Sequence, residues 1–166
     1  MCGIAGFISE RNLDFKNILD TMILKMNHRG PDSSGTWYHE NLKIGLGHAR
    51  LSIVDLSQTG HQPMASFSKR YQIVFNGEIY NYKYLRKTLE QFYSFRTQSD
   101  TEVLYYGLVH FGIDFVNELR GMFAFALYDA TLQKIFLVRD PNGIKPLYYA
   151  TINNQLIFAS ELKAFQ

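Results

Sequence analysis

The first part of the chain changes from a strand-like to a helix-like spacing of apolar residues. Residues 3–9 form a short, mostly apolar segment, which predicts a buried strand. Apolar side chains then recur every three or four positions from residue 15 to residue 26, and this spacing predicts an amphipathic helix. Gly30 and Pro31 follow, so residues 28–32 are predicted to form a rigid loop that can serve as one wall of a pocket.

Strand-like and helix-like segments share the middle of the chain. Residues 35–38, 42–50 and 71–75 have the composition of strands, and the Asn-Gly pair at 76–77 is a turn signal. Helical spacing returns in residues 82–92 and again in the segment that begins at Ser99. The Ser-x-x-Glu pattern there is typical of the first turn of a helix.

Antiparallel strands dominate the end of the chain. Residues 122–128 and 135–139 predict one hairpin, and residues 148–152 and 155–159 predict a second. The Asp-Pro-Asn-Gly segment at 140–143 predicts a tight structural turn. Because helices come early and in the middle and antiparallel strands dominate the end, the pattern indicates an α+β fold rather than alternating β-α-β units.

Domain organisation follows from the absence of internal boundaries in the sequence. No linker, repeat or low-complexity segment divides residues 1–166, so we expect one domain. Residues 160–166 have the pattern of a helix that is cut short, and we therefore expect the chain to be a fragment or an isolated domain.

Composition excludes several classes of function. Hydrophobic residues make up 46% and charged residues 19%, which predicts a packed core rather than disorder. The 17 Lys and Arg are scattered and the net charge is only +2, so we expect no nucleic-acid partner. Apolar runs are too short to span a bilayer and no signal peptide is evident, so we expect no membrane partner and a cytoplasmic location. One cysteine and dispersed histidines predict neither an internal disulfide nor a metal site.

Cys2 is unusual because it directly follows the initiator Met1. Removal of Met1 would place a free α-amine and a thiol on one residue. Their proton affinities nearly match, so the amine can act as the base for the thiol, which is the strategy of N-terminal nucleophiles. Taken alone, however, Cys2 is better explained as a small apolar residue at the chain start.

Three other places carry polar groups suited to a site. Arg50 ends a predicted strand, and its planar guanidinium can bind a carboxylate, although a surface salt bridge is the better explanation for a lone Arg. Asn76 and Gly77 can offer a side-chain amide and an unobstructed backbone N–H as an oxyanion hole, with an ordinary turn as an equal alternative. Asp100 is suited to a helix N-cap, a role compatible with ligand binding.

Taken together, these segments resemble the glutaminase domain of class II glutamine amidotransferases, and within them the asparagine synthetase type. The matching segments are residues 1–6, 28–32, 48–55, 75–82, 99–104, 121–129 and 139–148. They follow the family's order and span nearly the whole chain. The runs at 29–32 and 77–81 favour asparagine synthetases over glucosamine-phosphate synthase and the phosphoribosylamine-forming amidotransferase.

The resemblance implies a fold and a set of residue roles. The fold is the four-layer αββα arrangement of N-terminal nucleophile hydrolases, with two stacked antiparallel sheets flanked by helices. The implied roles are nucleophile for Cys2, oxyanion hole for Asn76 and Gly77, α-carboxylate binding for Arg50, α-ammonium binding for Glu78 and Asp100, and backbone pocket lining for Leu51, Ile53 and Val54.

The implied reaction is hydrolysis of L-glutamine to glutamate and ammonia through a Cys2 γ-glutamyl thioester. The ammonia would serve an asparagine synthetase-like, ATP-dependent amide-forming domain, which we expect after residue 166 or as a partner chain. No cofactor is expected within residues 1–166, since ATP and Mg belong to that synthetase domain. A homodimer stays open, and so does the ammonia acceptor, aspartate or another.

Three rival interpretations remain. One is an amidase of the same fold that cleaves a non-glutamine amide, although Arg50 with Glu78 and Asp100 suits an amino-acid zwitterion. Another is a non-catalytic interaction domain. A thiol redox role is the least favoured, because the sequence offers no resolving cysteine.

Overall fold

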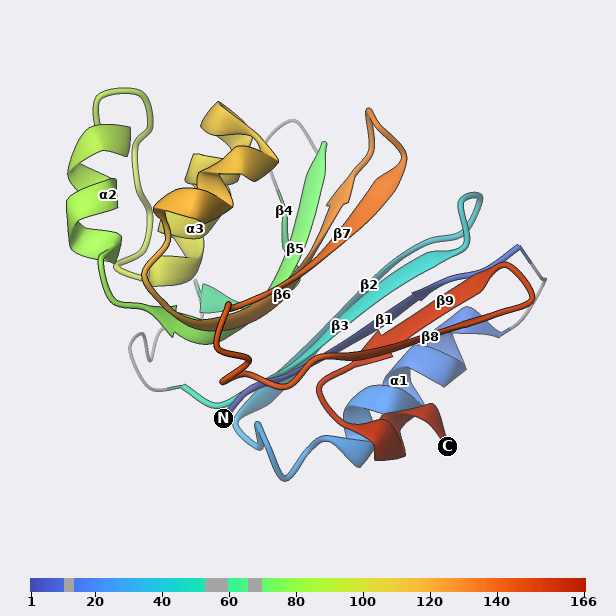
Figure 1. The fold of residues 1–166 in the computed structure, drawn as a ribbon. Coiled ribbons are helices and arrows are strands. Elements are labelled where there is room, and N and C mark those ends of the chain that lie inside the picture. The colour runs from blue at the N-terminus through green and yellow to red at the C-terminus, as the bar shows by residue number, and fades with distance from the viewer. Residues whose placement is uncertain (11–13, 53–59, 66–69) are drawn as a thin grey trace.

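The computed structural model describes residues 1–10, 14–52, 60–65 and 70–166 (Figure 1). The strands are β1 (Gly3–Ile8), β2 (Ser33–His39), β3 (Ile44–Arg50), β4 (Met64–Ala65), β5 (Tyr71–Ile79), β6 (Gly121–Asp129), β7 (Lys134–Arg139), β8 (Tyr148–Ile152) and β9 (Gln155–Ala159). The α-helices are α1 (Phe15–Lys25), α2 (Tyr82–Leu89) and α3 (Asp100–Phe111), and the 3-10 helices are η2 (Ile113–Glu118) and η3 (Leu162–Phe165).

Within the described residues, the strands form two antiparallel sheets. The first has the order β2-β3-β1-β9-β8, and the second has the order β4-β5-β6-β7. The central position of β1 in the first sheet brings the start of the chain between β3 and the late strand β9. Consequently, segments far apart in the sequence meet around residue 2.

Three apolar clusters separate four layers. Ile4, Leu46, Val74 and Phe158 belong to the cluster between the two sheets. A second cluster joins β1 and β3 to α1 on the outer face of the first sheet, and a third joins β5 and β6 to α2 and α3. Figure 1 shows the same order, with α2 and α3 over one sheet and α1 over the other. The predicted α+β, four-layer αββα fold is therefore confirmed.

Strand β5 corrects one expectation from the sequence. We predicted a strand that ends at Phe75 with a turn at 76–77, whereas β5 continues through both residues to Ile79. Pairing with β6 runs along its whole length, with Asn76 opposite Ala124 and Gly77 opposite Phe123. A Cβ on residue 77 would lie 2.4 Å from the Met122 carbonyl oxygen, so close packing against β6 accounts for this glycine.

The remaining elements agree with the sequence to within a few residues. Both C-terminal hairpins form as predicted, and Asn153 and Asn154 turn the second one with φ values of 49° and 61°. The predicted strand at 42–50 begins at Ile44, because Lys43 has a φ of 51° in the preceding turn. The predicted helix at 82–92 ends at Leu89, and residues 160–166 contain only the short η3. None of the helices in the described part of the chain has the length and apolar character needed to cross a membrane.

Candidate active site

Antiparallel pairing of β1 with β3 places Cys2 beside the end of β3. Gly3 pairs with Ala49. Continued by one residue, this antiparallel register brings Cys2 to the end of β3, next to Leu51. The Cys2 sulfur lies 3.4 Å from the Leu51 backbone nitrogen and 3.5 Å from the Leu51 carbonyl oxygen. Cys2 is only partly buried, so its thiol borders space that a ligand can reach.

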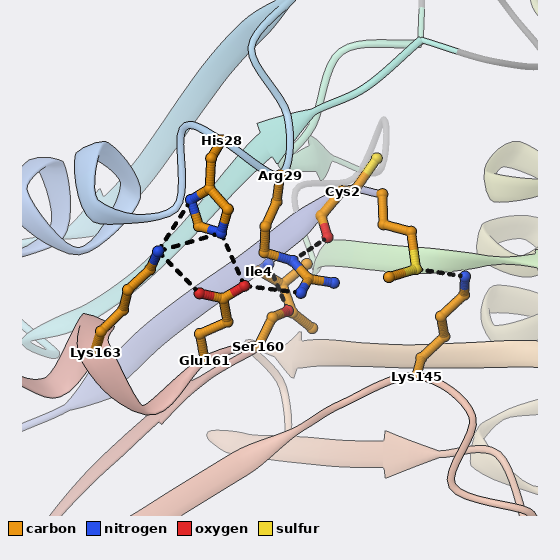
Figure 2. A network of polar contacts seen from close by, with 9 residues as sticks. Cys2, Ile4, His28, Arg29, Lys145, Ser160, Glu161 and Lys163 are labelled. Atoms are coloured by element: carbon orange, nitrogen blue, oxygen red, sulfur yellow. Dashed lines mark hydrogen bonds and ion pairs between the residues drawn. The ribbon is translucent and has the colours of Figure 1, made fainter.

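Arg29 holds the backbone of Cys2 from the other side (Figure 2). Its Nε donates to the Cys2 carbonyl oxygen at 3.0 Å, and its Nη1 donates to Glu161 at 3.0 Å. Glu161 also contacts His28 at 3.0 Å and Lys163 at 3.2 Å. Burial alone would raise the pKa of Glu161, but the hydrogen bonds from Arg29, His28 and Lys163 outweigh it and hold the pKa at about 2. Glu161 is therefore ionised at neutral pH and fixes the guanidinium on Cys2.

The predicted loop at 28–32 thus has a role other than the one expected. Its residues are not among those that line the pocket beside Cys2, yet Arg29 positions the candidate nucleophile and Asp32 accepts the Ser52 backbone N–H at 2.8 Å. Sequence reasoning did not single out Arg29 or Glu161, because only the fold brings these residues together.

A small pocket of about 90 Å³ opens beside the Cys2 sulfur. Its described lining residues come from the chain start before β1, from β3 and the two residues after it, from the segment before β4, from β5 and from the start of α3. They are Cys2, His48, Arg50, Leu51, Ser52, Gly60, Gln62, Phe75, Gly77, Ser99, Asp100 and Thr101. The pocket therefore brings together Cys2, Arg50, Leu51, Gly77 and Asp100 from the residues predicted for the site. Asn76 and Glu78 are not part of this lining, and Ile53 and Val54 lie outside the described residues.

The hydrogen-bond alternation of β5 directs one backbone donor into this pocket. The N–H groups of Phe75 and Ile79 both donate to side chains, to Gln62 at 2.6 Å and to Asp100 at 2.9 Å. Phe123, which pairs with Gly77, has its backbone bonds on its other side: its N–H donates to the Asp140 Oδ2 at 3.2 Å, and its carbonyl oxygen accepts the Asp140 N–H at 2.8 Å. Because alternate residues of a strand point their N–H groups to the same side, the Gly77 N–H faces the same open edge as those of Phe75 and Ile79.

Asn76 supplies a second polar group at this corner. Its side chain lies on the face of β5 that carries Val74, toward the other sheet, and the residue is 1% exposed. Its Nδ2 is buried without a hydrogen-bond partner in the described part of the molecule. A buried amide left unpaired destabilises the ligand-free protein by about 1–3 kcal/mol. The Asn76 Nδ2 is therefore a donor that a ligand could bind.

Asp100 and Arg50 are the charged groups closest to the pocket. Ser99, not Asp100, caps α3, with its Oγ accepting the Glu102 N–H at 3.2 Å, so the N-cap alternative for Asp100 is wrong. Burial raises the pKa of Asp100, and the charge of Glu78 raises it further. Glu78 itself is exposed. Arg50 is 8% exposed at the end of β3, so it is a buried residue and not one of the protein surface.

Residues missed by the sequence reasoning complete the pocket. His48 is 1% exposed, and its Nε2 donates to the Phe75 carbonyl oxygen at 3.1 Å. Burial lowers the pKa of His48 to about 3, so the ring is neutral at physiological pH. Gln62 and Thr101 also line the pocket, and the Gln62 Nε2 donates to the Thr101 Oγ1 at 3.4 Å. Among the described residues, no three His, Cys, Asp or Glu side chains gather as a set of metal ligands.

The stacked antiparallel sheets, with a cysteine near the chain start at the pocket, define an N-terminal nucleophile type of hydrolase fold. A family model described as the glutamine amidotransferase domain matches residues 1–166, and the chain belongs to this family of enzyme domains. The family predicted from the sequence is therefore confirmed.

Individual relatives agree with this assignment. The chain is 45% identical to glutamine-hydrolysing asparagine synthetase 1 of Bacillus subtilis, over 99% of this chain and 26% of that protein. It is 40% identical to the amidase chry2 of Gibberella zeae, over 99% of this chain and 26% of the relative. The chain thus spans about a quarter of the length of these relatives.

A solved structure shares the fold. The glutamine phosphoribosylpyrophosphate amidotransferase of Bacillus subtilis superposes with a TM-score of 0.84 over 99% of this chain and 43% of that chain, at 23% identity.

Proposed function

We propose that this domain hydrolyses L-glutamine to glutamate and ammonia through a γ-glutamyl thioester on Cys2. The observation that carries the proposal is the shared pocket of the Cys2 thiol, the Gly77 edge of β5 and the Arg50 guanidinium. A nucleophile, a directed N–H donor and a cation suited to a carboxylate are the groups that hydrolysis of an amino-acid amide requires.

Charge complementarity supports glutamine as the substrate. Arg50 is assigned to the α-carboxylate, because a guanidinium binds carboxylates through two parallel hydrogen bonds. Asp100 and Glu78 are assigned to the α-ammonium. Burial raises the pKa of Asp100, and an arriving ammonium group favours its ionised form. Substrate binding and ionisation of Asp100 therefore reinforce each other.

The chemistry then proceeds in two steps. The Cys2 sulfur attacks the side-chain amide carbon of glutamine, and the charge that develops on the carbonyl oxygen is met by the Asn76 Nδ2 and the Gly77 N–H. The C–N bond breaks, ammonia leaves with a proton delivered through the Cys2 amine, and a thioester remains. Water then attacks the thioester, the C–S bond breaks, and glutamate departs with the thiol restored.

The Cys2 amine takes part in this scheme only after Met1 is removed. Met1 is 54% exposed, and its sulfur contacts the Lys145 ammonium at 3.3 Å. A peptide bond to Met1 would replace the basic amine by an amide nitrogen. The proposal therefore requires a processed chain start in the active enzyme.

A second substrate class has specific support. Amidases of Gibberella zeae and Penicillium rubens are 40% and 38% identical to this chain, so a non-glutamine amide is the rival substrate. The glutamine-hydrolysing asparagine synthetases among the relatives support transfer of ammonia to an amide-forming synthetase domain or partner chain. The use of ATP and Mg by that domain stays a prediction. The cytoplasmic location, a homodimer and the acceptor stay predictions within this proposal.

Replacement of the nucleophile tests the function. Cys2→Ala should abolish release of ammonia from glutamine while circular dichroism and the melting temperature stay close to those of the unmodified protein. The glutamine-mimicking electrophile 6-diazo-5-oxo-norleucine should label Cys2, and excess glutamine should protect it. An active Cys2→Ala protein would refute the nucleophile assignment, and a panel of other amides hydrolysed faster than glutamine would favour the amidase alternative.

A further inference from the structure

The edge of β5 that faces the pocket has a strand partner over only part of its length. Strand β4 pairs with Gln72 and Ile73 and then ends. In the described part of the chain, no strand continues this pairing beside Phe75, Gly77 and Ile79. Their backbone groups on this side must therefore find other partners or stay open.

Two buried side chains take the place of the missing strand at Phe75. Gln62 Oε1 accepts the Phe75 N–H at 2.6 Å, and His48 Nε2 donates to the Phe75 carbonyl oxygen at 3.1 Å. His48 and Gln62 are 1% and 7% exposed. A strand neighbour makes the same pair of bonds, one with each backbone group of a single residue.

The chemistry of the two side chains fits these bonds. A carbonyl oxygen can only accept, so the Nε2 of His48 carries the ring hydrogen. Burial lowers the pKa of His48 to about 3, which keeps the ring in the neutral form that has one such donor. Gln62 is oriented in turn, because its Nε2 donates to Thr101 Oγ1 on α3 at 3.4 Å.

The position of this pair along β5 gives it a consequence for catalysis. Phe75 directly precedes Asn76 and Gly77, which carry the donors assigned to the oxyanion hole. We propose that Gln62 and His48 are positioning residues that clamp both backbone groups of Phe75 and thereby set the place and direction of the Asn76 and Gly77 donors. This inference rests on the proposed glutaminase function and deepens it.

The expected effect is a selective loss of transition-state stabilisation. Gln62→Met and His48→Phe remove the clamp with similar side-chain volume. They should lower kcat for glutamine hydrolysis by about tenfold to a hundredfold, because a misplacement on the order of 1 Å can cost a hundredfold. The KM should change by less than about threefold, since the donors act mainly on the developing oxyanion.

A substrate-like aldehyde separates positioning from general damage. Glutamate γ-semialdehyde adds the Cys2 sulfur to its carbonyl carbon and carries the resulting oxygen into the oxyanion hole. Its affinity should fall in parallel with kcat in both variants, whereas the affinity for L-glutamate should stay unchanged. His48→Gln keeps a donor at the place of Nε2 and should recover most of the activity lost in His48→Phe.

A matched control lies at the other end of β5. Arg70 makes an ion pair with Asp129 at 2.9 Å near the start of that strand, far along it from Gly77. Arg70→Met should reduce stability without changing kcat or the affinity for the aldehyde. Wild-type kcat and aldehyde affinity in Gln62→Met and His48→Phe would overturn the positioning role.

Hydrogen exchange tests the clamp independently of glutaminase activity. If the unmodified protein released no ammonia from glutamine, the proposed function would fail, and amide hydrogen exchange would then decide the clamp. Gln62→Met should speed exchange of the Phe75 amide hydrogen relative to Arg70→Met, because the substitution removes the acceptor of that amide. Equal exchange rates in these two variants would overturn the inference.

Discussion

The buried, neutral His48 should make the stability of this protein depend on pH in a specific way. His48 is 1% exposed, and burial lowers its pKa from 6.5 to about 3, with Arg50 and His61 lowering it further. The hydrogen bond to Phe75 acts in the opposite direction but is outweighed. Between these two pKa values, the unfolded chain binds a proton at residue 48 that the folded protein does not. The free energy of unfolding must therefore rise with pH across this window.

The magnitude follows from the proton that the unfolded chain binds. At pH 5, protonation of an ordinary histidine stabilises the unfolded state by about 2 kcal/mol relative to pH 7.5. The folded pKa of about 3 lies well below pH 5, so its own value has little influence on this figure. The contribution is complete above the unfolded pKa and is lost as the pH falls toward the folded one.

Urea unfolding at several pH values between 7.5 and 5 measures this term. His48→Gln and His48→Phe both lack the titrating ring, and only the first keeps a donor for Phe75. The difference in unfolding free energy between the unmodified protein and each variant should shrink by about 2 kcal/mol over this range. Because all other groups titrate in common, they cancel in the difference. Parallel pH profiles for the unmodified protein and both variants would refute a buried neutral His48.

Two further substitutions test the charged groups around the site. Arg50→Ala should raise the KM for glutamine by about tenfold or more with a smaller effect on folding, because it removes a carboxylate partner, and an unchanged KM in steady-state assays would remove Arg50 from the site. Glu161→Gln should lower kcat more than it changes KM, because Arg29 loses the charged partner that orients it on the Cys2 carbonyl; kinetics equal to those of the unmodified protein would show that the ion pair is not needed.

Local patterns in the sequence predicted most elements of the fold. The two late hairpins follow from alternating apolar residues on either side of turns, and such short-range pairing needs little tertiary information. The start of α3 was predicted from Ser99 and Glu102, and the serine does cap the helix. The stacking of two sheets, in contrast, came from the family resemblance rather than from periodicity.

The errors occur where tertiary contacts override local signals. An Asn-Gly pair after an apolar strand favours a turn, but pairing with β6 keeps both residues in an extended strand. Gln62 and His48 carried no sequence signal for their part in the site, because Phe75 lies far from both along the chain. Arg29 lies in the 29–32 run that carries the family resemblance, and its contact with Cys2 depends on the loop after α1 meeting the start of β1.

The energetics of the β5 edge explain why the site lies where it does. The N–H groups of Phe75, Gly77 and Ile79 point to the edge of β5 that faces away from β6. The Phe75 N–H donates to Gln62 and the Ile79 N–H donates to Asp100, and both of these side chains are buried. A buried donor without a partner, such as the Asn76 Nδ2, costs about 1–3 kcal/mol, so a protein selected for stability alone would pair it. Gly77 lines the pocket, and the Asn76 amide beside it lacks a partner among the described residues. A donor that is held in place without a protein partner stabilises a ligand atom most strongly when that atom becomes negative during the reaction. The cost of leaving the Asn76 amide unpaired is therefore consistent with a role in the proposed chemistry.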